Sequence, residues 1–169
     1  PPHFRPKRIC AVRGKLTRDW LLDMGVDCPE IYGDPALFLP EMFNPVVQKK
    51  YRIGFIPHKA DQRRMIGDLL IHPEHNDPMT YIKKLLSCEI IVSSSLHGLV
   101  TADAYGIPNI WLWHNLDGVP DFKWRDYYSA VGLDLKPIHD RGQITGVILR
   151  EASVKPKPDL ELLRSVRPF

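Results

Sequence analysis

The segment from residue 89 to residue 98 places a short apolar strand directly before three serines, a histidine and a glycine. Glu89-Ile90-Ile91-Val92 is short, β-branched and bounded by polar residues, which is typical of a buried strand in a parallel sheet. The residues after it, Ser93-Ser94-Ser95-Leu96-His97-Gly98, open a segment whose apolar residues recur at helical spacing. The sequence therefore predicts a strand, a turn and a helix, the repeating unit of an α/β sheet.

The junction between this strand and the helix favours an anion. Serines there can cap the helix, and the amide groups and positive dipole end of a helix N-terminus attract negative charge. Open α/β sheets also bind ligands at the carboxyl ends of their strands. We therefore predict a phosphate or carboxylate site formed by Ser94, Ser95 and Gly98, with the titratable imidazole of His97 in the first helical turn. The same pattern fits a plain serine-capped helix with a solvated histidine.

Cationic or titratable residues directly follow two more predicted strands. The strands are residues 8–12 and 52–56, and the residues that follow them are Arg13, His58 and Lys59. Because the carboxyl ends of parallel strands share one edge of a sheet, we expect these side chains near His97. A surface ion pair is the alternative role for Arg13.

The rest of the pattern continues the alternation of helices and strands. Helices are predicted over residues 15–24 and after the Asp77-Pro78 cap, and further strands over residues 30–32, 68–71 and 109–113, with a loop over residues 40–50. The predicted fold class is α/β, a doubly wound and largely parallel Rossmann-like sheet. We expect residues 1–7 to be a linker or the tail of a missing N-terminal region, residues 8–150 to form the catalytic domain, and residues 151–169 to form a linker and closing helix.

Composition excludes several classes of protein. The 169 residues suffice for one domain, and the formal net charge of +3 suits anionic substrates but falls short of a nucleic-acid-binding surface. No apolar run approaches the roughly 18 residues that span a bilayer. Cys10, Cys28 and Cys88 have no paired spacing, so we expect small core residues in a reducing, cytoplasmic setting. No residues have metal-ligand spacing, so neither a metal nor a cofactor is expected.

Four stretches, in order, resemble the polysaccharide pyruvyl transferase family. They are Ala-Val-Arg-Gly at 11–14, Gly-Asp-Pro-Ala-Leu at 33–37, Gly-Phe-Ile-Pro-His-Lys at 54–59, and Ser-Ser-Ser-Leu-His-Gly-Leu-Val-Thr-Ala-Asp-Ala-Tyr-Gly-Ile-Pro at 93–108. The resemblance runs from about Ile9 to about Leu133. Members of this family resemble two-domain glycosyltransferases of the GT-B type, so the chain is expected to be a C-terminal portion of a longer enzyme.

The resemblance implies a transferase that moves the enolpyruvyl carbons of phosphoenolpyruvate onto two hydroxyls of a hexose. The products would be phosphate and a pyruvate ketal on an exopolysaccharide or cell-surface glycan, or on its lipid-linked oligosaccharide precursor, which could bring the enzyme to the inner face of the membrane. The resemblance assigns Arg13 to the carboxylate or phosphate of the donor. It also supports Lys123 and Asp126, which lie in a Lys-aromatic-x-Asp-Tyr segment. His97 would donate a proton or stabilise the departing phosphate.

Other interpretations stay open at this point. The aromatic segment 121–128 could be a sugar platform, or an amphipathic helix with its aromatic residues in the core. The general base could be Asp126 or could lie in the missing N-terminal half. The whole chain could instead belong to a GT-B glycosyltransferase that uses a nucleotide sugar, or could be a non-catalytic domain that binds an anion or a glycan.

Overall fold

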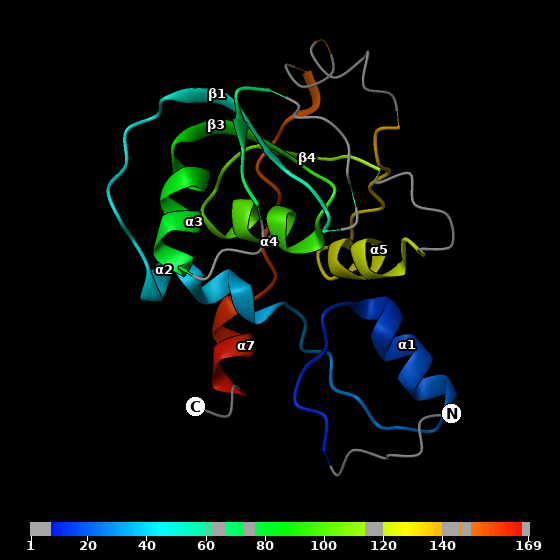
Figure 1. The fold of residues 1–169 in the computed structure, drawn as a ribbon. Helices are drawn as coiled ribbons and strands as arrows, with labels where there is room; N and C mark the ends of the chain where they lie inside the picture. The colour runs from blue at the N-terminus through cyan, green and yellow to red at the C-terminus, as the bar shows by residue number, and fades with distance from the viewer. Residues whose placement is uncertain are drawn as a thin grey trace. The chain divides into compact units, whose positions relative to one another are not determined.

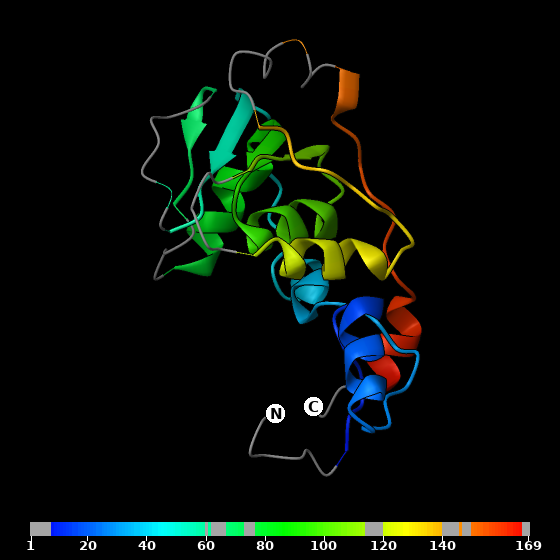
Figure 2. The ribbon, with the colours of Figure 1, turned by 90° about the vertical axis from the view of Figure 1, so that its right-hand side faces the viewer.

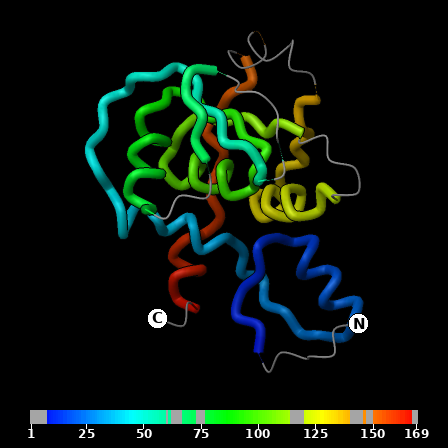
Figure 3. The backbone as a smooth tube through the Cα atoms, viewed as in Figure 1, coloured from blue at the N-terminus to red at the C-terminus, as the bar shows by residue number. Residues whose placement is uncertain are grey.

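The structure is a computed structural model that describes residues 8–59, 61, 67–72, 77–113, 120–139, 146 and 150–166. The chain divides into two compact units, and each is described by itself. The first unit comprises Pro1–Asp34, Asp121–Leu135 and Lys157–Phe169, and the second comprises Pro35–Pro120 and Lys136–Pro156. The course of the chain through these segments can be followed in Figure 3. The domain boundaries expected at residues 7 and 150 stay predictions.

The second unit is built on a parallel sheet, which has four strands within the described residues. The strands are β1 (Tyr51–Ile56), β2 (Leu69–Leu70), β3 (Cys88–Ser93) and β4 (Asn109–Trp111), in the order β2-β1-β3-β4. After β1 the chain adds β2 on one side and then crosses to place β3 on the other. The point at which the strand order reverses therefore lies between β1 and β3. The predicted Rossmann-like α/β sheet is confirmed.

Helices α3 (Pro78–Leu86) and α4 (Leu96–Ala104) cover one face of this sheet (Figure 1). The core on that face includes Ile56, Leu85, Ile91 and Ala102. The core on the opposite face includes Phe55, Val92, Ile110 and Leu112, with Ile138 and Ala152 packed against it. Successive strand residues point to opposite faces, so β1 and β3 supply side chains to both layers. This explains why residues 90–92 are apolar without alternation.

A local sequence signal placed the start of α3, whereas the serine cap predicted for α4 is not formed. The Asp77 carboxylate accepts hydrogen bonds from the amides of Met79 and Thr80, at 3.0 and 3.2 Å, and confirms the predicted cap of α3. The loop predicted over residues 40–50 is wrong at its start, because α2 (Leu39–Met42) follows the 3-10 helix η1 (Pro35–Phe38). Pro40 fits the first turn of α2, where a backbone N–H has no helical partner.

The first unit contains α1 (Lys15–Asp23), α5 (Phe122–Ser129) and α7 (Leu160–Ser165). The strands predicted over residues 8–12 and 30–32 are wrong beyond a single parallel bridge between Val12 and Tyr32. These segments belong to the first unit and pair with each other, so they do not extend the β1–β4 ladder. The expected closing helix is confirmed as α7, coloured red in Figure 2.

The three cysteines are free and differ in burial. Cys28 and Cys88 are buried, which confirms their predicted place in the core. Burial raises the pKa of the Cys88 thiol to about 11, so this thiol stays protonated and unreactive at neutral pH. Cys10 is only half-buried, and its predicted core role is wrong to that extent.

None of the helices formed by the described residues has both the length and the apolar character needed to cross a bilayer.

Candidate functional site at the carboxyl ends of β1 and β3

Ser94 ties the loop after β1 to the end of β3. Its hydroxyl donates a hydrogen bond to Asp61 Oδ2 at 2.7 Å and accepts one from the amide of His58 at 2.9 Å. Its own amide donates to the carbonyl oxygen of Ile56 at 3.1 Å. Ser94 is fully buried and Asp61 is only 7% exposed. The Ser94 side chain therefore holds the residues that follow β1. Its hydroxyl already has an acceptor, Asp61, and a donor, the amide of His58.

Sequence reasoning missed Asp61. In the structure its amide donates to the carbonyl oxygen of His58 at 2.7 Å, shortly after the end of β1. An aspartate shortly after a strand is a local signal for a turn. What the sequence could not show is that Ser94, more than thirty residues later, would supply the partner of its carboxylate.

Replacing Ser94 by alanine is expected to lower the free energy of unfolding by about 2 kcal/mol, because a hydrogen bond to a carboxylate and one from an amide are both lost in a buried place. Ser87→Ala is the matched control, since Ser87 is also buried but its hydroxyl donates to a backbone carbonyl oxygen, that of Lys84, instead of a carboxylate. The control is expected to cost about 1 kcal/mol. Urea denaturation of both variants measures the difference, and equal losses would contradict the bridging role of Ser94.

Gly98 lets α4 start directly against the sheet. A Cβ atom at this position would lie 2.2 Å from Ser93 Oγ and 2.9 Å from Ile56 Cγ2, distances at which real atoms must move apart. Ser93 Oγ itself donates to the carbonyl oxygen of Ile56 at 2.8 Å and accepts from the amide of Ser95 at 3.0 Å. The first turn of α4 is thus seated between the carboxyl ends of β1 and β3.

His97 is the exposed residue of α4, and the other residues of this helix are all buried. Its carbonyl oxygen accepts a hydrogen bond from Thr101 Oγ1 at 2.6 Å, so the backbone of the first turn is fixed. Within the described residues no side chain caps α4. An imidazole therefore lies at an open helix N-terminus, where the strand order reverses and the dipole favours an anion.

The predicted residues of the second unit gather at this edge of the sheet. His58 is half-buried and Lys59 exposed, directly after β1, while Ser94 and Ser95 are buried directly after β3. The backbone amide of His58 contacts the Ser94 hydroxyl, whereas the expected closeness of the His58 and Lys59 side chains to His97 stays a prediction. A role in substrate binding for these residues stays a proposal.

Arg13 belongs to the first unit and forms an ion pair there. Its Nε donates to Asp34 Oδ2 at 3.1 Å, and the Asp34 side chain is 6% exposed whereas that of Arg13 is 35% exposed. The alternative role of Arg13, an ion pair, is therefore present in the structure. A guanidinium has five N–H donors, and the terminal Nη groups of Arg13 have no partner in the described part of the chain. Asp34 orients this fork and leaves it able to bind a carboxylate or phosphate.

Asp126 caps a helix other than its own. Its Oδ1 accepts from the amide of Thr17 at 2.8 Å and its Oδ2 from Thr17 Oγ1 at 2.7 Å, and Asp126 is 1% exposed. Ser129 Oγ accepts from the amide of Lys15 at 2.8 Å. Two side chains of α5 therefore satisfy amides at the start of α1 that no helical carbonyl reaches. The predicted ligand or base role of Asp126 stays a prediction beside this structural one.

Three of the four aromatic residues of α5 lie in the core, and the fourth, Phe122, is exposed. Trp124, Tyr127 and Tyr128 are 0%, 5% and 1% exposed, which confirms the core interpretation of this segment for all three. Lys123 is half-buried, with its ammonium 4.3 Å from the centre of the Trp124 ring. Phe122 is 47% exposed, so the core interpretation is wrong for this residue, and its part in a sugar platform stays a prediction.

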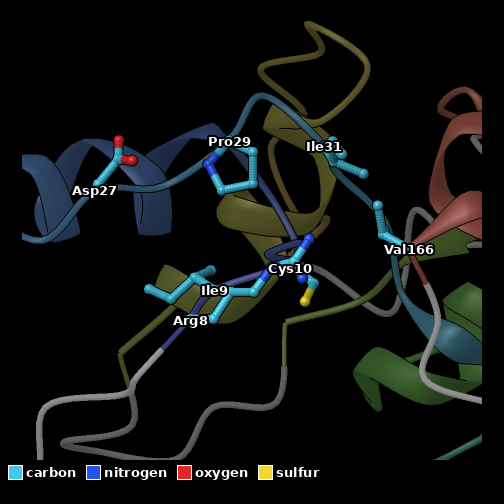
Figure 4. A pocket seen from close by; sticks show the side chains of 7 residues that line it. All are labelled: Arg8, Ile9, Cys10, Asp27, Pro29, Ile31 and Val166. Atoms are coloured by element: carbon cyan, nitrogen blue, oxygen red, sulfur yellow. The ribbon is translucent and has the colours of Figure 1, made fainter.

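A pocket of about 380 Å³ opens in the first unit, and none of the predicted site residues lines it (Figure 4). It is lined by Arg8, Ile9, Cys10, Asp27, Pro29, Ile31 and Val166. None of these belongs to the motifs that predicted a site, and the pocket has no second feature that indicates a ligand. Among the described residues no group of three His, Cys, Asp or Glu side chains could hold a metal ion.

A parallel sheet with polar residues and an open helix N-terminus where its strand order reverses defines an α/β protein of the Rossmann-like class. The family model described as polysaccharide pyruvyl transferase matches residues 5–115, which include every motif of the candidate site in the second unit. The chain belongs to this family, which is a family of transferases.

Two curated relatives were found. An uncharacterized protein of Acanthamoeba polyphaga mimivirus is 34% identical over 146 residues, which are 76% of this chain and 50% of that protein. The succinoglycan biosynthesis protein ExoV of Rhizobium meliloti (strain 1021) is 30% identical over 142 residues, 76% of this chain and 42% of that protein. The chain thus spans half the length, or less, of these relatives. No solved structure matches it significantly.

Proposed function

We propose that this chain carries the donor-binding part of a pyruvyl transferase that uses phosphoenolpyruvate and forms a pyruvate ketal on two hydroxyls of a hexose. The observation that carries the proposal is His97, the exposed residue of an otherwise buried helix, at an open helix N-terminus in a chain of this family. The acceptor would be a glycan or a lipid-linked oligosaccharide, worked on at the cytoplasmic face of a membrane. The name of the succinoglycan relative is in keeping with an acceptor of this kind.

The chemistry asks for three things: a cationic or dipolar cradle for phosphate and carboxylate, a proton for the methylene carbon, and a base for the incoming hydroxyl. In the proposal the amides at the start of α4 hold the anion, with His58 and Lys59 beside them. The imidazole of His97 gives the proton or stabilises the departing phosphate, since an imidazole can take either role near neutral pH. Among the residues that the structure describes, none has geometry that marks it as the base, and Asp126 stays the candidate from the sequence.

Arg13 enters the proposal on its own geometry. Asp34 holds its Nε and leaves the terminal Nη groups able to bind an anion in a bidentate way. Its contribution to donor binding is therefore tested separately from that of His97. Lys123 and Asp126 are proposed as further substrate contacts on the resemblance alone.

Isothermal titration with phosphoenolpyruvate tests the proposal. The wild-type chain is expected to bind, and His97→Ala and Arg13→Ala are each expected to weaken binding about tenfold, because each removes a charged or dipolar partner of the anion. Arg125→Ala is the matched control for Arg13→Ala, since Arg125 is an exposed arginine of the same unit, and it should bind as the wild type does. A folded wild-type chain that ignores phosphoenolpyruvate but binds a uridine diphosphate sugar would favour a glycosyltransferase instead.

A further inference from the structure

An aromatic pair lies just beyond the carboxyl end of β4. The amide of Trp113 donates to the carbonyl oxygen of Ile138 at 2.8 Å, and the amide of Ile138 donates to that of Trp111 at 2.9 Å. This parallel pairing continues the sheet past β4 and brings His139 beside Trp113, with 5.7 Å between the ring centres and 40° between the ring planes. Two residues 26 positions apart in the sequence are thus held together by backbone hydrogen bonds.

The pair is anchored by Trp111 and keeps part of its surface exposed. Trp111 is 4% exposed, and its ring centre lies 6.3 Å from that of Trp113, so it backs the platform from within the core. Trp113 is half-buried and His139 is exposed. A large aromatic ring in this setting is fixed by its neighbours and still presents surface, which is the form that a binding platform takes.

The position of Trp113 relates it to the anion site. Trp111 is the register partner of Ser93 on β3, and Leu112 donates to the carbonyl oxygen of Ser93 at 2.9 Å. Side chains two positions apart along a strand share a face, so Trp113 continues the face of Trp111 and Ser93. Ser93 Oγ is on the side where α4 begins, because it is the atom that a Cβ at Gly98 would meet. Trp113 therefore lies at the same edge and on the same face as the first turn of α4.

We propose that Trp113, with His139 packed against it, is the platform on which the hexose ring of the acceptor stacks. One face of a hexose presents C–H groups to an aromatic ring, and its rim presents hydroxyls to a polar neighbour such as an imidazole. Trp124, Tyr127 and Tyr128 of α5 are buried and cannot serve this purpose. The inference rests on the proposed function for its choice of a hexose, and it adds the place at which the hexose binds.

Saturation-transfer NMR on the whole chain tests the platform, with methyl glucoside, methyl galactoside and methyl mannoside as probes. The wild type is expected to transfer saturation to the ring C–H protons of at least one hexoside. Trp113→Ala should weaken that binding about tenfold, the size of effect that loss of an aromatic stacking partner has, and Trp113→Phe should retain most of it. Trp20→Ala is the matched control, because Trp20 is 53% exposed on α1 in the other unit. Unchanged binding by Trp113→Ala, or no hexoside bound by the wild type, would overturn the inference.

The same samples separate this inference from the proposed function. A Trp113→Ala chain that is folded by circular dichroism should still bind phosphoenolpyruvate as the wild type does. If the chain binds a hexoside through Trp113 but does not bind phosphoenolpyruvate, the platform is supported and the proposed donor is contradicted. If the chain binds phosphoenolpyruvate, and hexoside binding is unchanged by Trp113→Ala, the proposed donor is supported and the platform is contradicted.

Discussion

Replacing His97 by alanine is expected to lower the rate of ketal formation by about 10²- to 10⁴-fold, the usual contribution of a general acid, while the protein folds normally. The side chain is exposed on a helix whose other residues are buried, so its removal leaves no cavity in the core. Its backbone carbonyl, which Thr101 binds, is unaffected by the substitution. The free energy of unfolding should therefore change by no more than about 0.5 kcal/mol.

A second variant separates the two roles proposed for His97. Glutamine keeps a side-chain N–H but cannot carry a titrating proton at neutral pH. His97→Gln should therefore bind phosphoenolpyruvate better than His97→Ala does and still lose turnover. Proton NMR of the ketal methyl group, formed from phosphoenolpyruvate and the methyl hexoside that binds best, measures the rate. Normal turnover by either variant would remove His97 from the chemistry.

Short-range patterns accounted for much of the second unit. The β-branched run before the three serines predicted β3 and α4, and Asp77-Pro78 predicted the start of α3, because strand burial and helix capping depend on neighbours within a few residues. The prediction that the ends of parallel strands share one edge is confirmed for β1 and β3, where the backbone amide of His58 contacts the Ser94 hydroxyl. Topology alone sufficed there, since parallel strands must align their carboxyl ends.

Partners far apart in the sequence could not be predicted. Nothing local to residues 8–12 shows that they join a different unit from the sheet, and their apolar pattern is the same in either case. The partners of the Asp61 and Asp126 carboxylates could not be predicted from nearby sequence either. Each carboxylate binds groups 33 or more positions away, so their sequence surroundings resemble those of ordinary polar residues in loops and helices.

Gly14→Ala is expected to be the most damaging small substitution in the first unit, with a loss of about 3 kcal/mol in the free energy of unfolding. A Cβ atom at residue 14 would lie 1.7 Å from the carbonyl oxygen of Asp126 and 2.7 Å from its Oδ1. The backbone of Gly14 is extended, with φ of −155°, so any residue could adopt it and the whole cost comes from the close approach of α5. Asp126 cannot retreat without releasing the amide and hydroxyl of Thr17, which its carboxylate holds.

Gly25→Ala provides the matched control at the other end of α1. Gly25 has φ of +71° with no heavy atom within 4 Å of its would-be Cβ, so alanine there meets backbone strain but no clash. That strain should cost about 1 kcal/mol. Urea denaturation followed by circular dichroism compares the two variants. If Gly14→Ala proved no worse than Gly25→Ala, α5 would have to move away without cost. The hydrogen bonds that Thr17 donates to Asp126 would then not hold these helices together.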